Sequence, residues 1–292
     1  MDRTIQLHRV PNFRDVGKTV NSFLGQKRIR EGVIYRSARP DEATQEDKRI
    51  IRDELGIKTI IDLRTKTELL EQAEKHRRRP NGLVSSESSA APAHPQRISG
   101  IHYQEIKIVG RPFERHLLSQ LTWWSFIKVV FLFIFGYRMD AVRIISQEVL
   151  LPRGLVGLGT DTLDHSGAEV CAALSLYTSA QSIPVLLHCT RGKDRTGLVC
   201  ALILMALNVP LPAIEHDYCL TDAALLPEPE RDERLAELRG IGLTDAWAST
   251  AEDMISGMEK HLAQKYGGLD AYLDTIGFGE ADRAMLCEAL LY

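Results

Sequence analysis

The feature that most constrains this chain is a polar loop between two apolar segments. The first segment, 183–187, predicts a buried strand, and the second, 198–207, predicts a buried helix. The residues between them, 188–197, read His-Cys-Thr-Arg-Gly-Lys-Asp-Arg-Thr-Gly. A loop that joins the end of a strand to the start of a helix offers backbone N–H groups and the helix N-terminus to one ligand. This segment therefore predicts an anion site.

The side chains of this loop fit nucleophilic attack on a phosphate ester. The positive field of the loop favours the thiolate form of Cys189, which is the nucleophilic form. Arg195 has a planar guanidinium that can hold two phosphoryl oxygens at once. His188 is expected to support the loop by packing and hydrogen bonding. The residues expected to bind phosphate are Thr190, Arg191, Gly192, Lys193, Asp194, Arg195 and Thr196.

The loop resembles the signature of cysteine-dependent phosphatases, His-Cys-x5-Arg. Its extended form, HCTRGKDRTG, is similar to the tyrosine-phosphatase-like branch that includes bacterial dual-specificity and lipid phosphatases and fungal relatives. Other stretches that fit this resemblance are 12–17 (NFRDVG), 35–37 (YRS), 61–64 (IDLR), 266–268 (YGG) and 272–273 (YL).

The resemblance implies a fold and a reaction. The fold would be a three-layer α/β domain over 1–292, with a mostly parallel sheet flanked by helices and the loop at the carboxyl end of a strand. The reaction would be two-step hydrolysis of a phosphomonoester through a phosphocysteine at Cys189. No metal and no organic cofactor is implied. The alternative is a catalytically silent phosphate-binding scaffold on the same fold.

This chain differs from the wider superfamily in its general acid. The superfamily often uses an aspartate within Trp-Pro-Asp. This chain lacks that tripeptide, and 106–111 has no carboxylate. Asp194 lies beside Arg195, where myotubularin-like lipid phosphatases also carry an aspartate. A phosphate dianion nearby would favour the protonated form that an acid needs. Asp194 is therefore a catalytic candidate, and an equally good interpretation is that it braces the loop.

The net charge and the spacing of the cysteines limit which classes of binding partner and which cellular compartment are expected. A net charge of −3 gives no reason to expect nucleic acid. The five cysteines show no paired or metal-ligand spacing, which favours a reducing, cytoplasmic location. Three cations, Arg191, Lys193 and Arg195, alternate along the loop and are expected to converge on one site. The resemblance implies a phosphorylated protein, a phosphoinositide or a small phosphate ester as the substrate.

The rest of the chain predicts alternating strands and helices. Residues 1–74 are interpreted as a β-rich entry and a βα unit, with Asp41 or Thr44 capping a helix over 45–55. A Ser/Ala/Pro-rich segment, 77–100, predicts a mobile insertion. Further predicted strands cover 32–37, 58–64 and 100–109, a loop covers 154–162, and helices cover 67–76, 164–180, 213–220, 230–238, 245–265 and 280–290.

The resemblance also implies a helical lid insertion over residues 111–150. Within it, 117–135 is strongly apolar, and its fully apolar part is shorter than the ~20 residues that span a bilayer. A buried lid or core helix is the preferred interpretation. Peripheral membrane contact through 117–135 is the alternative, supported by flanking arginines.

Overall fold

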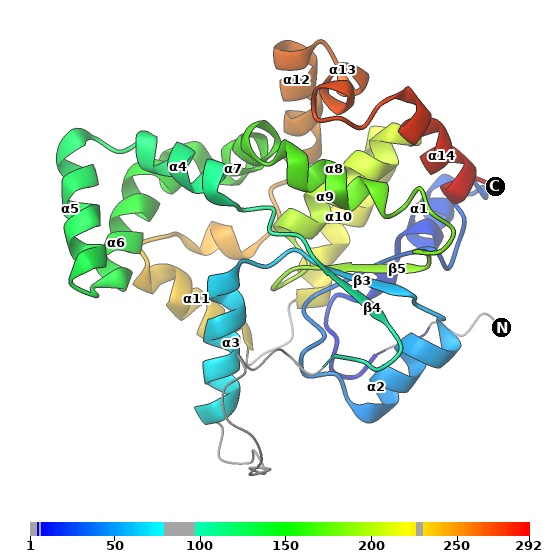
Figure 1. The fold of residues 1–292 in the computed structure, drawn as a ribbon, viewed down its shortest axis with the longest axis horizontal. Coiled ribbons are helices and arrows are strands. Elements are labelled where there is room, and N and C mark those ends of the chain that lie inside the picture. Colours follow the sequence, from blue (N-terminus) through cyan, green and yellow to red (C-terminus); the bar gives the residue numbers. More distant parts are fainter. Residues whose placement is uncertain (1–4, 6, 79–96, 226–229) are drawn as a thin grey trace.

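A five-stranded sheet with helices on both faces organises the molecule (Figure 1). The structure, a computed structural model, describes residues 5, 7–78, 97–225 and 230–292. The strands are β1 (Arg14–Asp15), β2 (Ile34–Ser37), β3 (Thr59–Asp62), β4 (His102–Glu105) and β5 (Val185–His188). Their order is β1-β2-β5-β3-β4, and all neighbours are parallel except the β1–β2 pair. The predicted mostly parallel sheet is thus confirmed, and β5 lies at its centre.

The helices follow in chain order. They are α1 (Val16–Leu24), α2 (Gln45–Arg49) with a π-helical turn η1 (Ile50–Glu54), α3 (Lys66–Arg78), α4 (Arg111–Ser119), α5 (Trp123–Ile134), α6 (Arg138–Ile145) with a π-helical turn η2 (Ser146–Leu150), α7 (Leu151–His165), α8 (Gly167–Ser175), α9 (Asp194–Ala206), α10 (Leu211–Leu225), α11 (Glu230–Gly240), the 3₁₀ turn η3 (Asp245–Ala248), α12 (Met254–Tyr266), α13 (Leu269–Thr275) and α14 (Glu280–Leu290).

The central strand divides its side chains between two cores. Val185 and Leu187 of β5 pack into the larger core with α9, whereas Leu186 faces a smaller core that includes Ile51 of η1 and Ile60 of β3. This alternation is the side-chain period of a strand that is covered on both faces. Helix α9 is buried from Thr196 to Met205, which explains its nearly unbroken apolar sequence.

The prediction of a loop over 154–162 is wrong, because this stretch, which contains several glycines, belongs to α7. Only Gly154 leaves helical geometry, with φ 66°. Gly159 and Gly257 allow α7 and α12 to approach closely: an added Cβ would lie 2.9 Å from Met254 Sδ at the first and 2.5 Å from Val156 Cγ1 at the second. The glycines therefore serve packing between helices, which sequence composition alone does not distinguish from a loop.

Several predicted boundaries also need correction. The entry to the chain contains α1, not only β structure, and the helix expected over 245–265 is split into η3 and α12. Thr44 caps α2, while Asp41 accepts hydrogen bonds from Arg64 instead. The strand over 100–109 is limited to β4, and α8 ends at Ser175 rather than near 180. Most of the predicted insertion at 77–100 lies outside the described residues.

Helices α4 to α6 form the side of the molecule toward which β4 leads the chain (Figure 1). Helix α5 is fixed to this group by a small separate core that includes Leu121, Val129 and Ala141. Most of its other side chains are exposed, so the preferred prediction of a buried helix is wrong. Among the described helices, none combines the length and apolar character needed to cross a bilayer.

Candidate active site

The predicted anion loop connects β5 to α9 at the carboxyl end of the sheet. Cys189 follows the last residue of β5 and is 3% exposed, and α9 begins at Asp194. Gly192 has φ 67°, and an added Cβ there would lie 2.2 Å from the Ser37 carbonyl oxygen. Only glycine fits this turn, because both the positive φ and the close backbone approach exclude a side chain.

Side chains distant in sequence hold the loop carbonyls. Asn12 Nδ2 donates to the carbonyl oxygens of Arg191 and Gly192, at 3.1 Å each, and Arg36 Nη2 donates to Gly192 at 2.7 Å. The C=O and N–H of a trans peptide point in opposite directions. Fixing these carbonyls therefore turns the next two N–H groups to the other side of the loop, as an anion-binding nest requires.

A buried ion triad anchors these supports. Arg36 Nη1 lies 2.6 Å from Asp217 Oδ2, and Arg14 Nε lies 2.9 Å from Asp217 Oδ1. Burial raises the pKa of Asp217, but the charges of Arg36 and Arg14 outweigh it and hold the pKa below its usual range. Arg14 Nη1 also donates to Asn12 Oδ1, which orients the Asn12 amide. The triad thus connects β1, β2 and α10 to the loop.

Glu68 on α3 binds the loop arginine. Arg195 donates from Nη1 to Glu68 Oε2 at 2.7 Å and from Nη2 to Oε1 at 2.6 Å, and Nη1 also donates to the Leu63 carbonyl at 3.1 Å. The Thr190 hydroxyl donates to Glu68 Oε1 as well. Although burial opposes it, hydrogen bonding and the charge of Arg195 lower the pKa of Glu68 to about 2. Glu68 is therefore ionised at neutral pH and fixes the guanidinium plane.

The structure places Lys193 differently from the predicted convergence of three cations. Its ammonium donates to the carbonyl oxygens of Trp247 at 3.0 Å and Ser249 at 2.7 Å, and it lies 3.3 Å from Asp194 Oδ1. Lys193 thus braces the loop against the segment around η3. Direct contact between this ammonium and a phosphate stays a prediction, as does a phosphate contact by the half-buried Arg191.

Asp194 and Thr196 occupy the first turn of α9. The Asp194 side chain is 43% exposed and pairs with Lys193, so it has solvent on one side. Thr196 is fully buried, and its hydroxyl has no hydrogen-bond partner among the described residues. A buried hydroxyl usually has a partner. Thr196 Oγ1 is therefore available to a group that arrives at the loop.

A second polar cluster supports the loop from β3. His188 is buried, with Nδ1 3.3 Å from the Cys189 carbonyl oxygen and Nε2 3.8 Å from Asp62 Oδ2. Burial lowers the pKa of His188, and the charge of Arg64 adds to this effect. Arg64 in turn binds both Asp62 and Asp41. The expected supporting position of His188 agrees with these contacts.

Sequence reasoning missed Asn12 and Glu68 as parts of the site, whereas the family resemblance implies that Arg36 lies near the loop, with a structural role at a strand end as an equally good interpretation. Asn12 and Arg36 lie in stretches that contributed to the family resemblance, but no spacing rule connects them to a loop more than 150 residues away. Glu68 lay in a helix interpreted only as charged. The sequence carried a signal for it only in its position shortly after a strand expected to end beside the loop.

Comparison with known proteins agrees with this geometry. The model of a tyrosine phosphatase family matches residues 5–292. A tyrosine-protein phosphatase of Nostoc commune is 30% identical over 154 residues, which cover 50% of this chain and 51% of that protein. The triple specificity protein phosphatase PtpB of Mycobacterium tuberculosis is 27% identical over 133 residues, covering 40% of this chain and 47% of that protein. The chain thus spans about half the length of these curated relatives.

A solved structure overlaps only loosely. The core catalytic domain of the PP-IP phosphatase SIW14 from S. cerevisiae, in complex with citrate, has a TM-score of 0.35 and 16% identity, over 82% of this chain and 99% of that one. An overlap at this level carries no argument about function. The family match, by contrast, covers nearly the whole chain, including the loop and the side chains that hold it. The chain belongs to the tyrosine phosphatase family.

Proposed function

We propose that this chain is a cysteine-dependent phosphomonoester hydrolase that acts through a phosphocysteine. The observation that carries the proposal is the loop itself: a buried Cys189 at its start, carbonyls held outward by Asn12 and Arg36, and Arg195 in the first turn of α9. Donors fixed before the reaction stabilise the charge of a transition state without reorganising, which is their main catalytic advantage.

The reaction has two displacements. Cys189 Sγ, as the thiolate, attacks phosphorus; the S–P bond forms, the ester P–O bond breaks, and the leaving oxygen takes a proton. Water then attacks phosphorus and gives a proton to the group that protonated the leaving oxygen, the S–P bond breaks, and inorganic phosphate and the thiolate are released. The loop amides and Arg195 bind the equatorial oxygens. Thr196 Oγ1 donates to the sulfur when it leaves, since nothing else in the described structure occupies this hydroxyl.

Asp194 is the proposed proton donor in the first step. Arg195 lowers the pKa of Glu68, and His188 and Arg64 lower that of Asp62 despite its burial, so both groups stay ionised at neutral pH. A carboxylate held ionised is a poor acid. Asp194 lies in the first turn of α9, next to Arg195, and its side chain reaches solvent, with Oδ1 3.3 Å from Lys193 Nζ.

The proposed substrates are phosphotyrosine proteins, phosphoinositides or another phosphate ester. The relatives' names, a tyrosine-protein phosphatase and a triple specificity protein phosphatase, favour a phosphorylated protein among these classes. A silent scaffold is less consistent with the site, because a pure phosphate binder does not need a thiol at the start of its loop. A reducing, cytoplasmic location stays a prediction.

Hydrolysis of p-nitrophenyl phosphate by the purified chain tests the proposal. Cys189→Ser should abolish turnover but retain phosphate binding, because the loop amides and Arg195 remain. Arg195→Ala should lose both. Cys287→Ser, which changes a free cysteine on α14 in the same way, is the matched control and should keep the parent rate. More than trace activity in Cys189→Ser, or no hydrolysis by the parent, would refute covalent catalysis at this cysteine.

A further inference from the structure

Helix α5 presents an apolar surface that nothing in the described structure covers. Of fifteen exposed large hydrophobic side chains among the described residues, eleven lie within 123–139. These are Trp123, Trp124, Phe126, Ile127, Val130, Phe131, Phe133, Ile134, Phe135, Tyr137 and Met139. We call them the α5 patch. An apolar patch of this kind marks an interaction surface, because a monomer that only meets water has little use for it.

The helix is held so that this surface faces outward. Only Ser125, Val129 and Leu132, spaced four and three residues apart, are not exposed along α5. This spacing is one narrow face of a helix, and it packs into the small core shared with α6. On the opposite side, Trp124 and Ile134 are 78% and 72% exposed. The patch is therefore a built surface with a fixed inner face rather than a disordered apolar segment.

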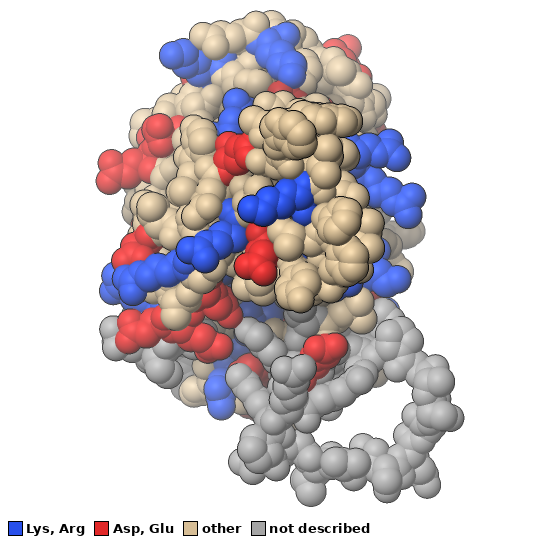
Figure 2. Space-filling view, turned by 90° about the vertical axis from the view of Figure 1, so that its left-hand side faces the viewer, with Lys and Arg blue, Asp and Glu red and all other residues tan. Residues whose placement is uncertain are grey.

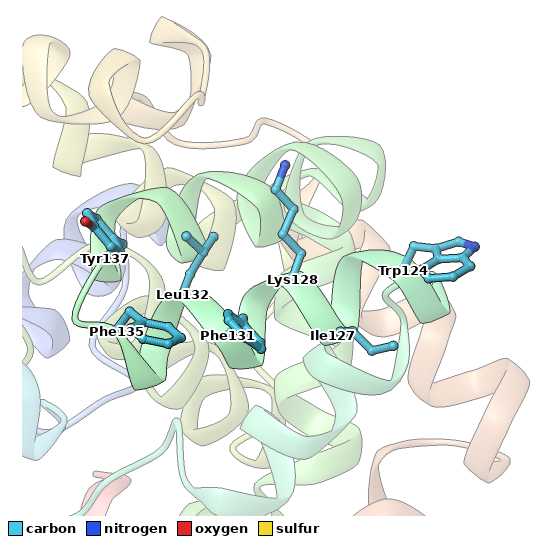
Figure 3. Close-up of a pocket in the computed structure, with 7 residues that line it drawn as sticks. All are labelled: Trp124, Ile127, Lys128, Phe131, Leu132, Phe135 and Tyr137. Carbon is cyan, nitrogen blue, oxygen red and sulfur yellow. The ribbon is translucent and has the colours of Figure 1, made fainter.

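The patch also has a hollow. Side chains from α5 and the turn after it surround a space of about 540 Å³ (Figure 3). Figure 3 shows Ile127 and Phe131 in a row along the helix, with Phe135 and Tyr137 at one end and Trp124 at the other. Lys128 projects from the same helix, with its aliphatic chain beside the apolar side chains. A lysine in this position can keep its charge in water while its stem contacts apolar groups.

Charge around the patch is opposite to that of the whole chain. Residues 111–150 contain five Arg or Lys and three Asp or Glu, a net charge of +2, whereas the chain carries −3. Figure 2 shows this face, with uncharged surface in its middle, a cationic side chain across it, further cationic side chains along its margin and acidic side chains beside it. A second copy of the chain would bring like charges together across such a face. An anionic surface would instead be attracted.

From the aromatic side chains, the exposed helix face and the local positive charge, we propose that the α5 patch docks the protein on the surface of an anionic lipid bilayer. Helix α5 has twelve residues, about 18 Å of helix, against about 30 Å of hydrocarbon. It would therefore lie in the interface plane, with aromatic rings among the headgroups and acyl chains and Lys128 at the phosphates. Acyl chains are a suitable occupant for an apolar hollow.

The α5 patch lies on the side of the molecule toward which strands of the sheet that carries the candidate active site lead. Strands β3 and β4 lead at their carboxyl ends into α3 and α4, on the side of the molecule where α5 also lies (Figure 1). The segment around η3 that holds Lys193 follows α11, and Gly242 between them lies against Gln147 of η2. If the proposed phosphatase function holds, docking would bring the loop close to phosphorylated lipid or membrane protein.

Vesicle binding by the full chain tests docking without reference to turnover. The probes are vesicles of phosphatidylcholine alone and vesicles with about 30% phosphatidylserine, in which part of the phosphatidylcholine carries brominated chains. We expect binding mainly to the anionic vesicles and quenching of tryptophan fluorescence by bromine, since Trp123 and Trp124 would enter the bilayer. The Cys189→Ser variant should bind equally well, so that failed docking and failed catalysis are separate results.

Two sets of substitutions assign the binding. The double variant Trp124→Gln, Phe135→Gln should weaken binding to anionic vesicles at least about tenfold, because two large apolar side chains leave the membrane contact. The double variant Lys128→Gln, Arg138→Gln should weaken binding to anionic vesicles about fivefold per cation removed. This loss should be smaller at high salt, because salt screens the attraction. Met285→Gln, an exposed apolar residue on α14, is the control and should bind as the parent does.

Three outcomes would overturn the proposal. The first is no binding of the parent to anionic vesicles at low salt. The second is binding without bromine quenching, which would indicate adsorption through charge alone. The third is a concentration-dependent dimer in sedimentation velocity that the Trp124→Gln, Phe135→Gln variant abolishes, since the patch would then be covered by a second copy of the chain.

Discussion

The side chain of Asn12 is predicted to fix the loop without contacting the substrate. Its amide donates to two loop carbonyls at 3.1 Å each, and its backbone has φ 57°. Asn12→Gly removes the amide and leaves a residue that adopts this φ freely, so the backbone is kept. Each lost hydrogen bond costs about 1 kcal/mol net, or about 2 kcal/mol for the pair. If this cost appears only in the organised transition state, kcat/KM falls about 30-fold.

Steady-state kinetics on p-nitrophenyl phosphate, together with inhibition by inorganic phosphate, measure this loss. The matched control is Asn208→Gly, because Asn208 at the end of α9 is the other non-glycine residue with positive φ among those described, at 53°, and lies outside the site. It reports what a glycine costs at such a position. Asn12→Asp keeps the size of the side chain but faces the two carbonyls with an acceptor, and should lose at least as much as Asn12→Gly.

Two outcomes would contradict the role predicted for Asn12. If Asn12→Gly keeps kcat/KM within about twofold of Asn208→Gly, the carbonyls do not need this amide, and Arg36 alone would hold the Gly192 carbonyl. If Asn12→Asp is as active as the parent, the direction of the hydrogen bonds is misassigned.

Three further predictions concern charged residues in the loop or bound to it. Glu68 has a folded-state pKa of about 2 against an ordinary 4.5, so it stabilises the fold above pH 4.5 by about 3 kcal/mol at most and loses this as pH falls toward 2. The stability measured by urea unfolding should therefore fall more between pH 4.5 and 2 in the parent than in Glu68→Gln, in which Asp62 and Asp217 still contribute. Asp194→Asn should slow hydrolysis of an alkyl phosphate greatly and that of p-nitrophenyl phosphate little, and equal losses on both would mean that Asp194 only shapes the loop. Lys193→Ala should slow hydrolysis of a polyphosphorylated inositol head group more than that of p-nitrophenyl phosphate, whereas equal effects would confine Lys193 to bracing the segment around η3.

Local sequence determined the central part of this protein. A short apolar run, a loop with Cys189 and Arg195, and a long apolar run predicted strand, loop and buried helix, and the structure has β5 and α9 there. The prediction was correct because each element is buried on all sides. Burial on all sides requires an unbroken run of apolar residues, which can be recognised without knowledge of the rest of the chain. The predicted C-terminal helix over 280–290 matches α14 for the same reason of local periodicity.

Tertiary structure decided what holds the loop and what the apolar helix does. Asn12, Arg36 and Glu68 reach the loop only because the parallel sheet brings β1, β2 and α3 to the edge where β5 ends. Likewise, the apolar sequence of α5 is compatible with both a buried helix, which was the preferred prediction, and an interfacial helix. The difference lies in what packs against it, since apolar periodicity reports that a face avoids water but not which partner covers it.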